Sequence, residues 1–147
     1  MKIGICNDHR GVYMKKVIFE YLEHSGYDVV DYGTDMDEGV DFPEYAFKVG
    51  DALSKKRINM GIAICGTGIG MSIALNKIKG VYCAKVSTIN EAVLCRQHNN
   101  ANAIAFSADM DQDQAKEIVD KFLETDFLNL DKYKRRNKMI KDRENND

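Results

Sequence analysis

Short apolar runs alternate along the chain with longer segments in which apolar residues recur every three or four positions. The short runs are typical of strands buried on both faces of a parallel sheet. They span 3–6, 27–32, 60–65, 81–86 and 102–107. The longer segments have the spacing of helices that bury one face. They span 12–24, 43–57, 71–78, 88–100 and 115–123. Because strand and helix alternate five times with short links, we predict an α/β fold, a Rossmann-like three-layer α/β/α sandwich around a five-stranded parallel sheet.

Single residues at the segment ends support these boundaries. The only proline, Pro43, stands in the expected first turn of the second helix, where its missing N–H costs little. Thr88 and Glu91 have the spacing of a capping box at the start of the fourth helix. Residues 1–147 contain no repeat or linker, so we expect one domain that ends in a basic tail helix at about 131–143.

The composition excludes several classes of function. A net charge of −2 offers no general attraction to nucleic acid or to a membrane, so neither is expected as a partner. The chain shows no signal peptide and no apolar segment of membrane-spanning length, and a cytoplasmic location is expected. The cysteines at 6, 65, 83 and 95 lack the spacing of a zinc site, so no metal is expected, and buried free thiols are the simplest interpretation.

Three glycines within five residues, Gly66, Gly68 and Gly70, separate the strand at 60–65 from the following helix. Such a loop exposes backbone N–H groups at the positive end of a helix dipole, and these can hold a phosphate, a carboxylate or a developing oxyanion. A tight turn with a purely structural role is the alternative. The loop lacks the lysine of a P-loop, and no acidic residue follows about twenty positions later, where a dinucleotide-binding motif needs one.

In this fold, ligands bind beyond the carboxyl ends of the strands, which is where Asp8, His9 and Cys65 are expected. The N–H groups of the loop would stabilise a thiolate at Cys65, although a lone cysteine is more often a core residue. Asp8 and His9 follow the first strand as catalytic groups often do, and an Asx turn at Asp8 beside a solvated His9 is the alternative. A phosphorylated receiver domain is disfavoured, because it needs an aspartate at position 65.

His98 ends the helix that leads into the fifth strand, so it is expected at the amino edge of the sheet. Cys65 is expected at the carboxyl edge, on the order of 15–20 Å away. If both side chains act on one substrate, His98 must come from a second subunit, and we predict a homodimer with shared sites. The basic run that begins at Lys132 is either a solvated helix face or part of a phosphate clamp.

Four motifs together resemble the type B ribose-5-phosphate isomerases, whose relatives include galactose-6-phosphate and allose-6-phosphate isomerases. The motifs are 7–11 (NDHRG), 40–46 (VDFPEYA), 64–77 (ICGTGIGMSIALNK) and 96–102 (RQHNNAN). The resemblance covers essentially the whole chain. It implies a Rossmann-like fold and the cofactor-free isomerisation of an aldose phosphate to a ketose phosphate. The first candidate is the conversion of ribose 5-phosphate to ribulose 5-phosphate in the pentose phosphate pathway.

The resemblance also implies roles for single residues. Cys65 would be the base that moves a proton between C2 and C1, with Thr67 assisting. His98 would open the sugar ring with Asp8 near the ring oxygen, and Asn99 would bind hydroxyl groups. The other implied contacts are backbone N–H groups at the oxyanion and side chains around the phosphate: Gly66, Gly68, Ile69, Gly70, His9, Lys132 and Arg136. The family works as a dimer with sites at the subunit interface, and a tetramer of two dimers is a further option.

Three places depart from the family pattern. Asp109 stands where the family usually has an arginine, and Lys132 and Tyr133 stand where arginine and histidine are common. The third departure is 80–82 (GVY) in place of Gly-Ile-Arg. Because loss of an arginine weakens a phosphate clamp, another sugar phosphate or a sugar without phosphate is an alternative substrate. A sugar-phosphate-binding homologue without turnover is the third alternative, which the intact set of implied catalytic residues disfavours.

Overall fold

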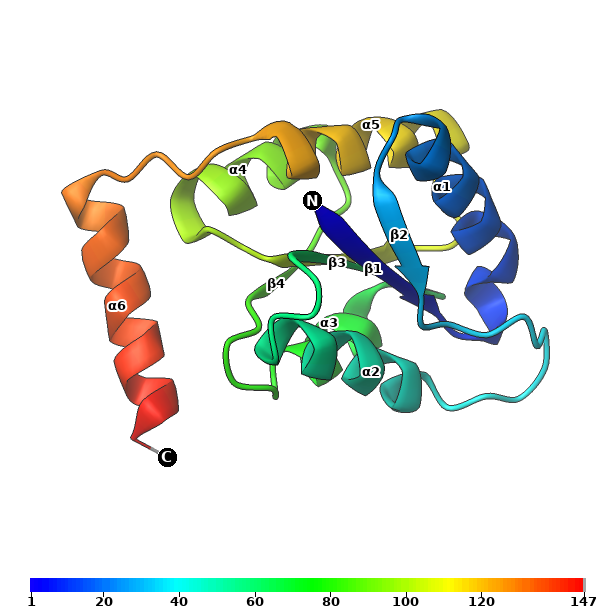
Figure 1. Ribbon diagram of the computed structural model, residues 1–147, viewed down its shortest axis with the longest axis horizontal. Coiled ribbons are helices and arrows are strands. Elements are labelled where there is room, and N and C mark those ends of the chain that lie inside the picture. The colour runs from blue at the N-terminus through cyan, green and yellow to red at the C-terminus, as the bar shows by residue number, and fades with distance from the viewer. Residues whose placement is uncertain (147) are drawn as a thin grey trace.

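A computed structural model describes residues 1–146 as a five-stranded parallel sheet between two layers of helices (Figure 1). The strands are β1 (Lys2–Asn7), β2 (Asp28–Asp31), β3 (Met60–Cys65), β4 (Cys83–Lys85) and β5 (Ala103–Ser107), in the spatial order β2-β1-β3-β5-β4. The helices are α1 (Val12–His24), α2 (Phe42–Ser54), α3 (Ile69–Leu75), α4 (Ile89–Asn99), α5 (Gln112–Glu124) and α6 (Asp131–Asn145), with a short 3₁₀ turn, η1 (His9–Gly11), before α1. The predicted α/β sandwich is confirmed; Asp147, the last residue of the expected domain, lies outside the described residues.

The two faces of the sheet carry side chains of different size. Large residues such as Ile62, Ile104 and Phe106 pack under α1, α4 and α5. Small residues such as Ala63 and Ala105 point to the other face, where α2 and α3 pack. Successive strand residues alternate between the faces, so the alternation of large and small residues along β3 and β5 sets the two layers. Cys65 is placed by this alternation on the side of α2 and α3.

The elements on either side of one bend depart from their predicted bounds, and α2 also ends three residues earlier than predicted, at Ser54. The helix expected at 71–78 is α3, which begins two residues earlier and ends at Leu75. The strand expected at 81–86 is reduced to Cys83–Lys85. The side chain of Asn76 accepts from the N–H of Cys83 (2.8 Å) and donates to its carbonyl (2.9 Å), while Asn102 accepts from the N–H of Tyr82 (2.9 Å). Asn102 takes the N–H of Tyr82, and β4 begins one residue later, at Cys83. α3 ends because the N–H groups of Lys77 and Ile78 turn to the carbonyls of Ala74 and Leu75, three residues back.

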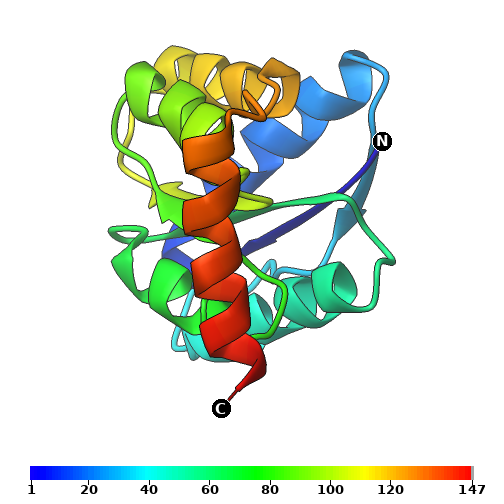
Figure 2. The same cartoon turned by 90° about the vertical axis from the view of Figure 1, so that its left-hand side faces the viewer.

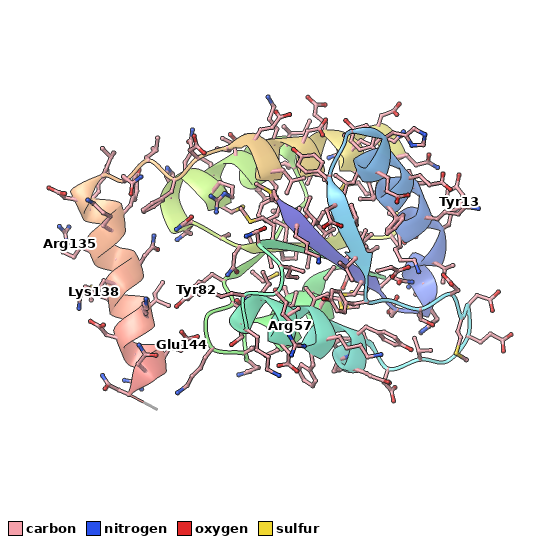
Figure 3. The ribbon with its side chains drawn as sticks, in the orientation of Figure 1. Tyr13, Arg57, Tyr82, Arg135, Lys138 and Glu144 are labelled. Atoms are coloured by element: carbon pink, nitrogen blue, oxygen red, sulfur yellow. The ribbon has the colours of Figure 1, made fainter. Side chains whose placement is uncertain are left out.

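The tail helix α6 stands apart from both helical layers. It runs across the edge of the sheet at β4, from the level of α4 and α5 to the level of α3 (Figure 2). None of its residues is buried. Glu144 attaches its end to the bend before β4, accepting from the hydroxyl of Tyr82 (3.0 Å; Figure 3) and from the N–H of Gly80 (3.1 Å). A cavity of about 690 Å³ lies between α6 and the residues around β4 and the end of α4.

Other sequence-based expectations concern caps, membrane spans and metals. The capping box of Thr88 and Glu91 is confirmed, with the N–H of Glu91 donating to the Thr88 hydroxyl at 3.1 Å. Within residues 1–146, no helix has both the length and the apolar character needed to span a bilayer. The same residues include no cluster of three or more histidine, cysteine or acidic side chains arranged to hold a metal ion.

Candidate functional site

Cys65 ends β3 and lies against the glycine loop that follows. Its sulfur accepts a hydrogen bond from the N–H of Gly68 (3.1 Å), and the N–H of Ile69 donates to the hydroxyl of Thr67 (3.1 Å). Two N–H groups expected to face a ligand are therefore already bonded inside the loop. Cys65 is only 4% exposed, whereas Thr67 and Ile69 are exposed. The sulfur is thus nearly covered, beside a loop that faces solvent.

The glycines of this loop are required by close packing. Gly68 has φ +82°, and a Cβ there would lie 2.8 Å from the backbone of Phe106 in β5. A Cβ at Gly70 would lie 2.7 Å from the ring of Phe42, at the start of α2. The loop can follow β3 so tightly only because these positions lack side chains. α3 has only seven residues. The attraction of a helix N-terminus for negative charge comes mainly from the N–H groups of its first turn, so even this short helix presents donors at the glycine loop.

Asp8 and His9 lie beside the end of β3, as predicted. The N–H of Asp8 donates to the carbonyl of Ile64 (3.2 Å), which holds the turn after β1 against β3. The Asp8 carboxylate accepts from the N–H of Arg10 (2.9 Å), so the Asx turn weighed as an alternative is present. His9 is not solvated: it is half-buried, and its Nδ1 is buried with no hydrogen-bond partner among residues 1–146. An unpaired buried nitrogen next to the glycine loop is available to a ligand.

The end of β5 completes this edge of the site. The Ser107 hydroxyl donates to the carbonyl of Gly66 (2.8 Å), and the N–H of Ala108 donates to the carbonyl of Cys65 (2.8 Å). Asp109 follows directly, and its carboxylate accepts from Nη2 of Arg10 at 3.2 Å. An ion pair therefore stands at the mouth of the glycine loop, formed by residues from two different turns.

His98 and Asn99 lie at the opposite edge of the sheet, in the last turn of α4 before β5 begins. The imidazole of His98 stacks on the ring of Tyr133, with centroids 4.6 Å apart and planes 22° apart. Asn137 donates to the His98 carbonyl (3.1 Å), and the ammonium of Lys132 lies 5.0 Å from the Tyr133 ring centre. Two residues of α6 thus hold His98 in place, and a third extends the stack.

The predicted site residues therefore form two groups within one chain. The first group lies at the carboxyl ends of β1, β3 and β5 and comprises Cys65, Asp8, Thr67, His9, Gly66, Gly68, Ile69 and Gly70. The second lies on the end of α4 and the first turns of α6 and comprises His98, Asn99, Lys132 and Arg136. β5 runs the length of the sheet between them, so the chain does not bring His98 to Cys65.

The other thiols are held in their neutral form. Burial raises the pKa of Cys6 and of Cys83, and burial raises the pKa of Cys95 to about 11. Cys83 is half-buried rather than buried, which corrects the expectation for that residue. A buried neutral thiol is chemically inert. Of the four cysteines, Cys65 is the one with a backbone N–H directed at its sulfur.

Two contacts at the site were missed by the sequence reasoning. In the sequence, Arg10 is one position of the NDHRG motif, and Tyr133 is a departure from the family pattern. Arg10 stands next to two predicted site residues, which was the one available signal. Nothing in the spacing of His98 and Tyr133 indicates that their rings stack, because they are brought together by the path of the chain after α5.

Comparison with known proteins gives a consistent set of similarities. A model of the family described as Ribose/Galactose Isomerase matches residues 3–140. The chain is 42% identical over 123 residues to ribose-5-phosphate isomerase B of Escherichia coli, covering 83% of each chain. Its structure resembles ribose-5-phosphate isomerase B of Clostridium thermocellum, with a TM-score of 0.96, 38% identity and 99% coverage of both chains. It also resembles the Mycoplasma genitalium enzyme with bound ribulose 5-phosphate, with a TM-score of 0.93, 38% identity and coverage of 98% of this chain and 96% of that one.

Proposed function

Starting from the fact that the chain belongs to the ribose/galactose isomerase family and is an aldose–ketose isomerase, we propose that it converts ribose 5-phosphate to ribulose 5-phosphate by proton transfer through an enediolate. One observation carries the mechanism: the sulfur of Cys65 lies at the end of β3 with the N–H of Gly68 directed at it. Cys65 is therefore the base.

The reaction moves one proton between adjacent carbons. The Cys65 thiolate takes the proton from C2 of the open-chain aldose, and the electrons form the C1–C2 double bond while the C1 oxygen becomes an oxyanion. The N–H groups of Gly66 and Gly70 stabilise that oxyanion, and those of Gly68 and Ile69 join them only by leaving the Cys65 sulfur and the Thr67 hydroxyl as the sugar binds. The Thr67 hydroxyl passes the O2 proton to O1, and the thiol returns its proton to C1. Because Cys65 is 4% exposed and the loop lies against its sulfur, the loop must shift when the sugar binds.

Ring opening requires the second group of residues. His98 protonates the ring oxygen as its bond to C1 breaks, and Asp8, near that oxygen, takes the proton of the C1 hydroxyl. Asn99 binds sugar hydroxyls. Because these groups lie at the other edge of the sheet from Cys65, a second copy of the chain supplies them. The tail supports this arrangement: Leu128, Leu130, Met139 and Ile140 are all between 45% and 66% exposed, an apolar surface that a partner subunit would cover. We propose a homodimer with two shared sites, and a pair of dimers is compatible with it.

The phosphate is bound by His9 of one subunit and by Lys132 and Arg136 of the other. The unpaired Nδ1 of His9 supports this assignment on the first subunit. Asp109 stands on the same side, paired with Arg10, where the family usually has an arginine, and this departure keeps the second candidate substrate class, another sugar phosphate or a sugar without phosphate. The third alternative, a homologue that binds sugar phosphates without turnover, is disfavoured by the relatives named as isomerases.

The test is incubation with ribose 5-phosphate in deuterated water, followed by NMR. We expect deuterium at C1 of ribulose 5-phosphate and, by the reverse reaction, at C2 of ribose 5-phosphate. Replacing the base, Cys65→Ala, should lower the rate by about 10²- to 10⁴-fold. Cys83→Ala, which removes a neutral thiol away from the loop, is the matched control and should keep the rate.

The other outcomes separate the candidates. Label in galactose 6-phosphate, allose 6-phosphate or free ribose, but not in ribose 5-phosphate, would assign a different substrate. Absence of label with every sugar in the panel would leave only the binding homologue. Wild-type turnover in Cys65→Ala would remove the role given to Cys65 while leaving the isomerase activity intact.

A further inference from the structure

The mouth of the glycine loop carries a guanidinium that has no role in the mechanism above. Nη1 of Arg10 lies 2.9 Å from the point that a Cβ would occupy at Gly66, and Cζ lies 3.2 Å from it. The Arg10 side chain thus crosses directly over the first residue of the loop. A side chain at position 66 would collide with it, so the glycine leaves space for the guanidinium as well as for the turn.

We propose that Arg10 binds the phosphate of the substrate, and that Asp109 is the residue that positions Arg10 over the loop. This inference rests on the proposed function, because it names the cation that the same site uses. A guanidinium has five N–H donors in a planar fork, which matches two oxygens of a phosphate. The Asp109 carboxylate contacts Nη2 of Arg10, whereas Nη1 is the atom nearest to the Cβ position of Gly66. The N–H donors of Nη1 therefore remain on the side of the loop.

The exposure of the pair supports a role in ligand binding. The side chains of Arg10 and Asp109 are 54% and 73% exposed, and an exposed ion pair contributes little to folding stability. Arg10 is therefore not needed to hold the fold together. A dianionic phosphate that excludes water would compete well for the guanidinium, because charge-assisted hydrogen bonds strengthen when water is excluded.

The surroundings indicate on which side of Arg10 the phosphate lies. His9, with its buried and unpaired Nδ1, is the neighbour of Arg10 in η1. A cavity of about 610 Å³ on the α1 side of both residues also contains Glu20, Glu23, Asp31, Asp35 and Asp37. These five carboxylates outnumber the cations of the same cavity, Arg10, Lys15 and Lys16, and Lys15 is already paired with Asp31 and Asp35, so the cavity disfavours an anion. The phosphate is therefore expected on the other side, between His9, Arg10 and Gly66.

Three variants test the proposal. Arg10→Gln removes the guanidinium and the ion pair, Asp109→Asn removes the ion pair but keeps the guanidinium, and Arg57→Gln is a control for net charge. Arg57 is an exposed arginine between α2 and β3, at the opposite edge of the sheet (Figure 3). Thermal unfolding should be nearly unchanged in Arg10→Gln, because the exposed side chain leaves the backbone N–H bond to Asp8 in place.

The first measurement is the KM for ribose 5-phosphate. We expect Arg10→Gln to raise this KM by about tenfold or more, with a small change in kcat. The reason is that the lost charge-assisted contact is made equally in the ground state and in the transition state. Asp109→Asn should raise it by less than about threefold, and Arg57→Gln should leave it unchanged. An unchanged KM in Arg10→Gln would overturn the proposal, as would equal effects of Arg10→Gln and Asp109→Asn, since both variants lack the ion pair.

The second measurement does not depend on turnover. Titration calorimetry with inorganic phosphate should show weaker binding to Arg10→Gln than to the wild type, by a factor similar to the change in KM. If the wild type isomerises no sugar but this difference in phosphate affinity is found, the proposed function fails and the assignment of Arg10 stands. If the wild type isomerises ribose 5-phosphate and the affinities are equal, only the assignment of Arg10 fails.

Discussion

At the scale of single residues, the space around a glycine decides whether a side chain can replace it. Gly68 and Gly80 have almost the same backbone conformation, with φ +82° and +83°. A Cβ at Gly68 would meet the backbone of Phe106 at 2.8 Å, whereas nothing lies within 4 Å of a Cβ at Gly80. Backbone atoms in a central strand cannot yield, so only the first glycine is fixed by packing as well as by its φ angle.

This contrast predicts different costs for the same substitution. Gly80→Ala should lower the free energy of unfolding by about 1 kcal/mol, the strain of a positive φ. Gly68→Ala should lower it by about 2–4 kcal/mol, because overpacking adds to that strain. It should also reduce turnover, because a displaced Gly68 N–H no longer reaches the sulfur of Cys65. Chemical denaturation of both variants checks the energies, and equal values for the two would contradict the packing argument.

At the scale of elements, α6 acts as a support for the end of α4. It buries none of its own residues, yet two of them contact His98, through the ring of Tyr133 and the amide of Asn137. Glu144 fixes its far end to Gly80 and Tyr82. A helix attached at both ends across a cavity of about 690 Å³ can hold the imidazole of His98 in one orientation.

The stacking predicts a selective loss in Tyr133→Leu. Ribose 5-phosphate is a closed ring, whereas ribulose 5-phosphate stays open because its C5 oxygen carries the phosphate. We therefore expect turnover of ribose 5-phosphate to fall by about tenfold, a part of what a general acid contributes. Exchange of a C1 proton of ribulose 5-phosphate with deuterated water needs no ring opening and should be nearly unchanged. Tyr133→Phe keeps the aromatic ring and should retain both rates. The role of the stack would be contradicted if Tyr133→Phe lost as much turnover as Tyr133→Leu. It would also be contradicted if Tyr133→Leu slowed both reactions equally.

At the scale of the whole molecule, the two groups of site residues belong to opposite edges of one sheet. The register pairs Cys65 with Ser107 at one end of β5 and Gly61 with Ala103 at the other. His98 precedes the second of these ends, so no rotation of its side chain can reach the sulfur. In a twofold-symmetric dimer, each site would combine Cys65 of one subunit with His98 of the other.

This geometry predicts that two inactive variants restore activity together. When Cys65→Ala and His98→Ala chains are refolded as a mixture, half of the dimers are mixed, and each mixed dimer has one site with both residues intact. The mixture should therefore reach about one quarter of wild-type turnover. Turnover of each variant refolded alone is the baseline. A mixture no more active than the better of the two variants would exclude shared sites, and a monomeric mass for the active enzyme would do so independently.

Much of the fold could be predicted from local patterns, because buried strands and amphipathic helices differ in the spacing of their apolar residues. The errors have local causes that are not visible in hydropathy. α3 ends in i→i−3 bonds from Lys77 and Ile78, and the N–H of Tyr82 just before β4 is taken by the amide of Asn102. The Asx turn at Asp8 was weighed correctly, but the burial of His9 was not foreseen.

The sequence alone determined the parallel sheet, the loop of glycines after β3, and the placement of Cys65 and His98 at opposite ends of the strands. Each of these follows from the order of residues within a segment of the chain. Only the tertiary structure decided that Arg10 pairs with Asp109, that Tyr133 stacks on His98, and that Cys65 is almost covered. Arg10 and Asp109 are 99 positions apart, and contacts at such distances depend on how whole elements pack, which no local pattern specifies.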